Sequence, residues 1–400
     1  MKIIADFHIH SKYSRATSPK MDLEHIFESA KEKGITIVGT GDFTHPEWFN
    51  NLKNKLEPAE KGLYKLKGTD GSVRFIITGE ISNMYKRHGK GRRIHSLIIL
   101  PSLESAEKIN NILSLQGNIK SDGRPILGMD TEELLKIIID VAPKALFIPA
   151  HCMAPWFGVF GSMSGFDSLE EAFGKNAKHI YAMETGLSAD PRMIGRIPDG
   201  RKMTLISNSD AHSPIKLGRE VNVFDTKLSY SAIRNAIIKK DKSKFLNTIE
   251  FFPQEGKYYY DGHRSCDVSM SPKQRKKVKG ICPKCGRKLT VGVLSRVDEL
   301  ADRKDGFVPS GAIPYKSLVP LKEIIAEAIG IGPKTKGVEK QYQMLIQKFS
   351  NEFNILLDVP FEELSKFTLP KIAEGIKRVR SGKLIIEPGY DGKYGKVKIF

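Results

Sequence analysis

The chain has 400 residues, enough for two or three domains and at least one large core. Its apolar content of 40% and charged content of 28% are ordinary for a globular protein, and no apolar run approaches the roughly 20 residues needed to cross a bilayer. Lysine and arginine (64) exceed aspartate and glutamate (46) by 18. This excess favours a nucleic-acid partner; the alternative explanation is an ordinary soluble surface in a protein from a Lys-rich proteome.

The N-terminus enters a strand pattern at once. Residues 1–6 lack the long apolar segment of a signal peptide, so a cytoplasmic location is expected. Apolar runs typical of buried strands lie at residues 3–7, 35–40, 74–78, 94–100, 145–148, 180–183 and 203–206.

Helical spacing alternates with these strands. It appears at residues 23–30, 131–141 and 230–239, and Gly34 predicts the end of the first of these helices. The alternation predicts an α/β fold with a mostly parallel sheet, and the number of units favours a barrel over residues 1–240.

The pattern changes after residue 240. Residues 241–312 are basic and carry three of the four cysteines, which predicts a small zinc-binding module. Residues 313–400 read as a helical region with a Gly- and Lys-rich tail.

Metal-ligating residue types follow the predicted strands. His8 and His10 share one face of an extended chain. Glu184 follows a later strand. Each such residue alone is more often a cap, but a set converging at one barrel mouth would be costly without cations. We therefore predict a metal site with several ions, built from His8, His10, Asp42, Glu80, His95, His151, Asp210 and His212.

These residues resemble a known motif set. His8-Ile9-His10-Ser11, Gly79-Glu80, His95, Ala150-His151 and Ser209-Asp210-Ala211-His212 occur in the order of the polymerase and histidinol phosphatase (PHP) family. The resemblance implies a distorted (β/α)₇ barrel that holds two or three ions, usually Zn, Mn or Fe, and hydrolyses phosphate esters. It implies catalytic roles for His8, His10, Glu80, His151, Asp210 and His212.

The chain departs from that family at two positions. Arg15 stands where the family commonly has Asp, and Asp42-Phe43 stands where it commonly has an Asp-His pair. One metal position is therefore either weaker or rebuilt by Asp42 or the nearby His45.

The ligand types indicate the chemistry. Imidazoles and carboxylates suit Zn or Mn better than Ca, and we expect Zn in the barrel with Mn or Mg for catalysis. Two ions about 3.5–4 Å apart can activate a water for attack on phosphorus. No protein nucleophile is then needed, and Cys152 is predicted to pack in the core.

A second group of ligands has the spacing of a structural zinc site. His263 and Cys266 form an H-x₂-C pair, and Cys282 and Cys285 form C-x₂-C after fifteen intervening residues. A redox dithiol would leave His263 and Cys266 unexplained. Lys276 and Lys277 lie in the intervening loop, which either follows a phosphate backbone or is a solvated charge run.

The helical region contains Gly330-Ile331-Gly332-Pro333-Lys334, which resembles a helix-hairpin-helix whose backbone amides receive a phosphate; a simple helical hairpin explains it nearly as well. The order of PHP barrel, basic zinc module and helical hairpin resembles the endonuclease Q family of DNA-repair nucleases. Supporting stretches lie at residues 250–253, 260–264, 290–294 and 296–303.

This second resemblance implies cleavage of DNA on the 5′ side of uracil, hypoxanthine or xanthine, and at abasic sites. The damaged base should then leave the stack. Replication or repair proteins are further candidate partners, and no membrane is expected. The predicted substrate-binding residues are Asn83, Tyr85, Arg92, Arg93, Trp156, Phe157, Lys276, Lys277 and Lys334.

Two other functions compete with this one. A small-molecule phosphatase of the histidinol phosphatase type explains the barrel but not the zinc module or the excess charge. A DNA-binding module with a degenerate, non-catalytic barrel agrees with Arg15 and Phe43 but leaves the nearly complete ligand set unexplained.

Overall fold

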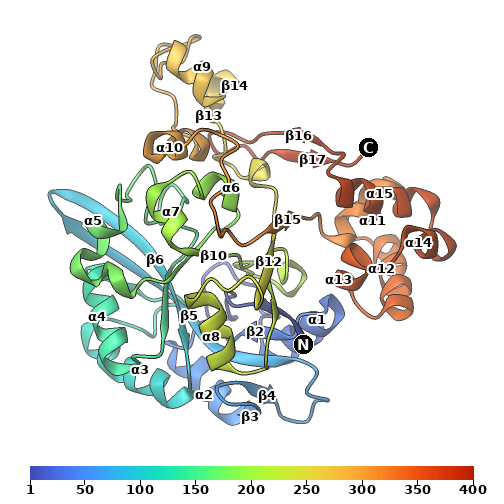
Figure 1. Ribbon diagram of the computed structural model, residues 1–400, viewed down its shortest axis with the longest axis horizontal. Helices are drawn as coiled ribbons and strands as arrows, with labels where there is room; N and C mark the ends of the chain where they lie inside the picture. Colours follow the sequence, from blue (N-terminus) through green and yellow to red (C-terminus); the bar gives the residue numbers. More distant parts are fainter.

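The computed structural model describes all 400 residues (Figure 1). An 11-stranded sheet organises most of it, with the path β15-β12-β11-β1-β2-β5-β4-β3 and with β6, β7 and β8 attached through β5 and β6. Its strands are β1 (Lys2–Asp6), β2 (Ile37–Gly39), β3 (Leu56–Pro58), β4 (Tyr64–Leu66), β5 (Arg74–Arg87), β6 (Lys90–Leu100), β7 (Ile126–Leu127), β8 (Leu146–Pro149), β11 (Val221–Asp225), β12 (Phe245–Glu250) and β15 (Tyr315–Ser317).

The sheet is mixed, and the prediction of a mostly parallel sheet was wrong. β1, β2 and β5 are parallel, but β5 and β6 form a long antiparallel hairpin, and β11 is antiparallel to β1. The hairpin turns through His88 and Gly89, both at positive φ (53° and 73°). A two-residue connection can join only antiparallel strands, and apolar runs alone do not report strand direction.

Two further strands, β9 (Ala182–Glu184) and β10 (Thr204–Ile206), pair in parallel between β8 and β11. The Cys152 amide, just after β8, donates to the Glu184 carbonyl, and the Asn222 side chain on β11 exchanges hydrogen bonds with the Ser207 backbone. The strands thereby surround one apolar interior, which includes Ile3, Ala5, Phe7, Ile37, Ile76, Leu97, Ile99, Leu146, Ile148, Ala182, Ile206 and Phe224.

Helices cover this arrangement. Asp22 caps the first of them by accepting from the His25 amide, and Gly34 ends it at φ 84°, as the sequence predicts. None of the helices in the chain is long and apolar enough to span a bilayer. The helices are α1 (Leu23–Lys33), α2 (Pro46–Lys55), α3 (Leu103–Gln116), α4 (Thr131–Val141), α5 (Leu169–Phe173), α6 (Pro191–Ile194), α7 (Pro198–Lys202) and α8 (Tyr230–Ile238).

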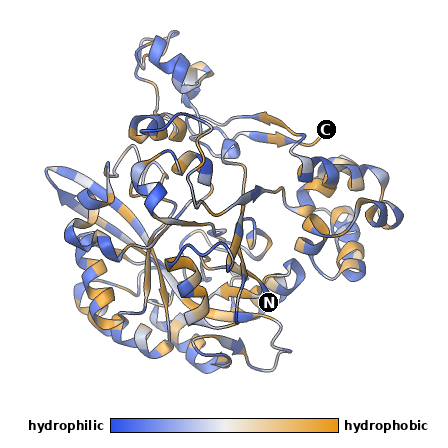
Figure 2. Cartoon of the chain, in the orientation of Figure 1, coloured by the Kyte–Doolittle hydropathy of each residue, from blue (hydrophilic) through white to orange (hydrophobic).

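A small module with β13 (Asp261–His263), β14 (Val268–Met270) and α9 (Pro272–Lys277) projects from the rest of the molecule, next to α10 (Val293–Leu300) (Figure 1). Its own apolar core consists of Val268, Cys282 and Leu289. Figure 2 shows α9 as mainly hydrophilic, in contrast to the apolar central strands.

The C-terminal helices are α11 (Leu321–Ile329), α12 (Lys336–Phe349), α13 (Glu352–Leu357), α14 (Phe361–Phe367) and α15 (Pro370–Ser381). A buried ion pair, Lys33 Nζ to Glu352 Oε2 at 3.2 Å, joins α1 to α13. The last hairpin, β16 (Ile385–Glu387) and β17 (Lys396–Lys398), returns beside the small module, where Asp391 accepts from the Arg264 amide at 2.6 Å. β12 and β15 lie outside residues 1–240, yet they extend the same sheet.

Candidate metal centre

Two ligand-bearing segments run side by side at the end of the sheet. Ile9 pairs with Ala211, and the His10 amide donates to the Ala211 carbonyl at 3.0 Å. Asp210 has φ 46°, in the left-handed region that non-glycine residues rarely adopt. This pairing brings the histidines after β1 together with the carboxylate after β10.

The first group of ligand atoms comes from these segments. Asp210 Oδ1 lies 3.1 Å from His10 Nε2 and 3.7 Å from His8 Nε2. All three atoms are buried, and none of them makes a hydrogen bond. Buried polar atoms without partners are costly, so this donor set fits a divalent cation.

The second group comes from β5, β6 and the segment after β8. Glu80 Oε1 lies 2.8 Å from His95 Nδ1 and 2.9 Å from His151 Nε2. The other oxygen, Oε2, faces the first group, 3.4 Å from His10 Nε2 and 3.6 Å from His8 Nε2. Glu80 therefore connects the two groups, as a carboxylate shared by two ions would.

Two carboxylates orient the histidines from behind. Glu184 approaches His8 Nδ1 at 3.0 Å, and Asp42 approaches His10 Nδ1 at 3.0 Å. The second oxygen of Asp42 accepts hydrogen bonds from Ser11 and Ser14. Asp42 therefore supports His10 instead of joining either ligand group; such partners fix the ring orientation and strengthen the ligand.

His45 also stays out of the two groups. Its ring stacks on Tyr13 with 4.4 Å between centroids. Among the residues expected to rebuild a third metal position, neither Asp42 nor His45 is brought to the cluster.

The carboxylates control the protonation of the histidines. Burial disfavours the charged ring, but Glu184 and Glu80 outweigh it at His8, and Asp42 and Asp210 outweigh it at His10, so the pKa of each is raised. Burial lowers the pKa of His95 to about 4. Binding of divalent ions here should therefore release protons from His8 and His10.

His212 and Cys152 lie at the margins of the site. The His212 ring is partly exposed and 4.5 Å from the His10 ring, and its Nδ1 is 2.9 Å from the Asp210 carbonyl oxygen. His212 is thus at the rim. Cys152 is fully buried, and burial raises the pKa of its thiol, as expected of a packing residue.

Asn83 and Tyr85 do not line the site, which corrects their predicted role in substrate binding. β5 continues to Arg87, so Glu80 lies within the strand, and side chains after it alternate between the two faces. Asn83 is on the opposite face from Glu80 and donates to the Met129 carbonyl at 3.2 Å. Tyr85 shares the face of Asn83.

Arg92 is also not a substrate contact. Its guanidinium stacks on Phe166 at 3.9 Å, pairs with Glu171 at 3.2 Å and donates to the Gly165 carbonyl. The strand alternation that buries Arg92 leaves Arg93 exposed, on the same face as His95.

The aromatic segment after His151 does reach the site. The Phe157 ring packs on His95 with 4.3 Å between centroids, and the Phe157 carbonyl accepts from the His95 amide at 2.9 Å. Trp156 next to it is 41% exposed, which leaves its indole available at the surface.

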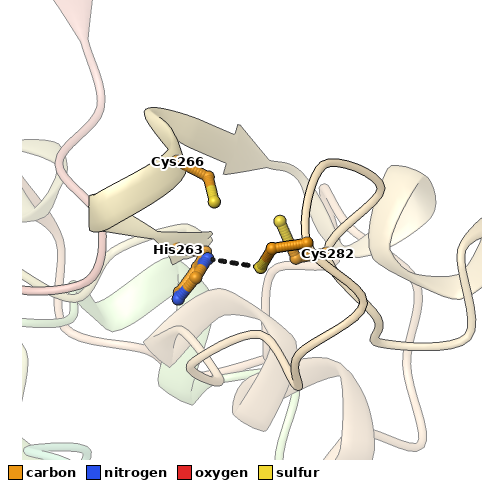
Figure 3. Close-up of side chains that lie close together, drawn as sticks. His263, Cys266 and Cys282 are labelled. Atoms are coloured by element: carbon orange, nitrogen blue, oxygen red, sulfur yellow. Dashed lines mark hydrogen bonds between the residues drawn. The ribbon is translucent and has the colours of Figure 1, made fainter.

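The four ligands of the cysteine cluster come together in the small module (Figure 3). The side chains of His263, Cys266 and Cys282 point toward one another, and His263 Nδ1 lies 3.3 Å from Cys285 Sγ. Their ligand atoms all lie within 4.8 Å of one another, which suits tetrahedral zinc. Burial opposes ionisation of Cys282, but the Lys284 and Cys285 amides outweigh it and lower its pKa to about 6.

The predicted backbone-contacting lysines are available to solvent. Lys276 and Lys277 are exposed on α9, and Lys334 is exposed in the loop between α11 and α12. No side chain caps the start of α12 at Thr335.

Sequence reasoning missed one neighbour of the metal centre. Arg124 Nη1 lies 3.1 Å from Glu80 Oε2. It comes from a loop without strand or helix periodicity, so no pattern in the sequence indicates that it reaches the site. The position of Glu184 after a strand marked it as a candidate in the sequence, but its contact with His8 could not be predicted from that position.

Comparisons with known proteins agree over the length of the chain. A family model described as the MJ0043 C-terminal domain matches residues 320–383. The uncharacterized protein MJ0043 of Methanocaldococcus jannaschii is 37% identical over 255 residues, 62% of this chain but only 31% of that protein. The uncharacterized protein YqxK of Bacillus subtilis is 30% identical over 413 residues, 99% of each chain.

Two solved structures are similar over the whole chain. The lesion-specific endonuclease PfuEndoQ from Pyrococcus furiosus has a TM-score of 0.88 and 35% identity, and the match covers 100% of this chain and 95% of that one. Endonuclease Q in complex with a 27-mer duplex carrying an abasic lesion has a TM-score of 0.87 and 35% identity, with 100% and 97% covered. The chain belongs to the endonuclease Q family of metal-dependent phosphodiester hydrolases.

Proposed function

We propose that this chain is a DNA-repair endonuclease that hydrolyses the phosphodiester 5′ to deaminated bases (uracil, hypoxanthine, xanthine) or at abasic sites. The observation that carries the proposal is Glu80, whose two oxygens face two separate groups of buried ligands. Such a shared carboxylate suits a pair of ions that act on one phosphoryl group.

The residues then have distinct roles. His8, His10 and Asp210 would hold one ion, and Glu80, His95 and His151 the other. Two bound divalent ions, Mn or Mg during catalysis or resident Zn, would activate water and neutralise charge on the phosphoryl oxygens. His212 would contact the phosphate or the leaving oxygen, a role supported by its partly exposed ring at the rim of the site. Zinc at the cysteine cluster would be structural.

DNA is the substrate that the surface supports best. The charge excess of 18 and the exposed Arg93, Lys276, Lys277 and Lys334 suit a phosphate backbone. A base turned out of the stack could pack on Trp156 and Phe157, beside His95. The related endonuclease bound to an abasic duplex supports this substrate class, and DNA as substrate supports a cytoplasmic location.

We further propose that the strands around the apolar interior form the distorted (β/α)₇ barrel of the PHP type. Residues 1–240 would contribute most of it, residues 241–312 the zinc module, and residues 313–400 a DNA-binding helical region. The hairpin of α11 and α12 would receive a backbone phosphate near Lys334.

A cleavage assay tests the function. The protein, His8→Ala and the matched control His25→Ala are incubated with Mn or Mg and duplexes that carry one uracil, hypoxanthine or abasic site. His25 is a half-exposed residue of α1. We expect incision 5′ to the lesion by the wild type and His25→Ala only. Phosphate release from small esters alone would indicate a phosphatase, and salt-sensitive binding without incision a binding module.

A further inference from the structure

The loop of residues 122–125 is fixed tightly against the metal centre. The Gly123 amide donates to the Tyr13 carbonyl at 3.0 Å, and the Ser82 amide donates to the Pro125 carbonyl at 3.0 Å. Thr44 Oγ1 donates to the Gly123 carbonyl at 3.2 Å. The loop is therefore held on both sides of Arg124, by the segment after β1 and by β5.

Gly123 allows this close approach. A Cβ at this position would lie 2.3 Å from Asp42 Oδ2 and 2.5 Å from Ser14 Oγ, closer than atoms can pack. The backbone is thus in contact with the side chains that orient His10. Because the loop has so little freedom, the position of Arg124 relative to the ligands is defined by the fold.

Arg124 lies between the buried ligands and solvent. Its Nη1 contacts Glu80 Oε2 at 3.1 Å, and its side chain is 24% exposed whereas that of Glu80 is 0% exposed. Nη1 is the only guanidinium nitrogen of Arg124 that donates a hydrogen bond within the chain. Of the five N–H donors of an arginine, most are therefore free for a ligand at the entrance.

Charge argues against a purely structural role. Glu80 already has His8, His10, His95 and His151 around it. A guanidinium next to two divalent ions is repelled by them; Glu80 offsets part of this repulsion, and an anion bound between the guanidinium and the ions would offset more of it. Ser82, two residues along the same strand face as Glu80, adds a buried hydroxyl without a hydrogen-bond partner.

We propose that Arg124 is a further catalytic residue, which binds a non-bridging oxygen of the scissile phosphodiester while Nη1 holds Glu80. The inference rests on the proposed function, since it assumes that a phosphodiester occupies the two-ion centre. The planar guanidinium suits paired phosphate oxygens better than an ammonium does, and it would stabilise the charge on these oxygens as water attacks phosphorus and the leaving oxygen departs.

Binding of inorganic phosphate tests the contact without turnover. Wild type, Arg124→Ala, Arg124→Lys and the control Lys120→Ala are loaded with Mn, their metal content is measured, and phosphate binding is followed by calorimetry. Lys120 is an exposed cation nearby in the chain that contacts neither ligand group. We expect at least about tenfold weaker binding in Arg124→Ala, partial recovery in Arg124→Lys and no change in Lys120→Ala. The metal content should be the same in all four proteins.

Single-turnover cleavage of the abasic duplex gives the second measurement. Arg124→Ala should cut about a hundredfold or more slowly with little change in duplex affinity. The proposal would be overturned if Arg124→Ala bound phosphate as tightly as the wild type, or if it lost metal from the two-ion centre in parallel. Arg124 would then act only by holding Glu80. If the wild type leaves lesion duplexes intact while phosphate binding still depends on Arg124, the proposed function fails and the phosphate contact stands.

Discussion

The two ligand groups around Glu80 and the cysteine cluster are built in opposite ways. The ligands of the first two groups come from five segments spread between residues 8 and 210, they are mostly buried, and carboxylates such as Glu184 hold their outer nitrogens. The cysteine cluster takes four ligands from a short stretch with a three-residue apolar core. The fold creates the first site, whereas the second site must help to create its own fold.

The largest expected effect is at the carboxylate shared by both groups. Glu80→Gln keeps the size of the side chain but removes its charge, so we expect cleavage to fall by roughly a thousandfold or more while the overall fold remains. The zinc proposed for the cysteine cluster should stay bound. Single-turnover rates, metal analysis and circular dichroism check this, with the exposed Glu104→Gln as control. Retention of full activity would mean that the two groups work independently of Glu80.

The next largest effect distinguishes the role of the cysteine-bearing module from that of the two ligand groups around Glu80. Cys282→Ser should release zinc, make residues 261–290 sensitive to protease and weaken duplex binding by roughly tenfold. Hydrolysis of a small phosphodiester should be unchanged, because the module contributes no residue to the two ligand groups around Glu80. Cys152→Ala, which alters the only cysteine outside the cluster, should keep zinc bound. If the module stays protease-resistant without zinc, its fold does not depend on the metal, and the contrast between the two kinds of site is wrong.

A smaller effect is expected behind the ligands. Glu184→Gln keeps an acceptor for the His151 amide but removes the charge that faces His8. The metal affinity of the two ligand groups around Glu80 should fall about 10–100-fold, and high metal concentration should restore activity. Glu170→Gln, an exposed change on α5, is the matched control. The test is a titration of activity against Mn for each protein, and superimposable curves would rule out this role.

The smallest effect concerns stability and pH. Burial raises the pKa of Glu250 to about 7 and also raises that of neighbouring Glu220. Folded protein then binds more protons than unfolded protein above pH 4.5, so the unfolding free energy should fall as pH rises toward 7.

Glu250→Gln should make this pH dependence shallower, by up to about 1.4 kcal/mol per pH unit for one proton. Urea unfolding at several pH values between 5 and 8 measures it, and Glu362→Gln, exposed on α14, serves as control. Identical slopes for all three proteins would show that Glu250 is ionised throughout.

The sequence predicted which residues converge in the fold better than it predicted the surroundings of these residues. His8 and His10 share a face because alternation in an extended chain is local, and the cysteine spacing is local as well. Asn83 and Tyr85 were misplaced because the strand was expected to end before them; it continues, and alternation turns them away. Arg124 approaches Glu80 only through tertiary packing, which no short sequence pattern encodes.

The direction of the strands was also wrongly predicted from the sequence. The apolar runs of β5 and β6 look like those of parallel strands, and only the turn at His88 and Gly89 distinguishes them. A long hairpin that is buried on both faces removes the alternation that usually marks antiparallel strands.

The return of the last hairpin to the cysteine-bearing module has a consequence for biosynthesis. Asp391 accepts from Arg264 and Thr290, and the Gly389 carbonyl accepts from the Tyr260 amide. These partners leave the ribosome long after Cys285, so the nascent module can bind a metal ion before the hairpin that supports it exists. This part of the molecule therefore reaches its final structure only after residues 389–391 have been made, although its four metal-ligating residues are made much earlier.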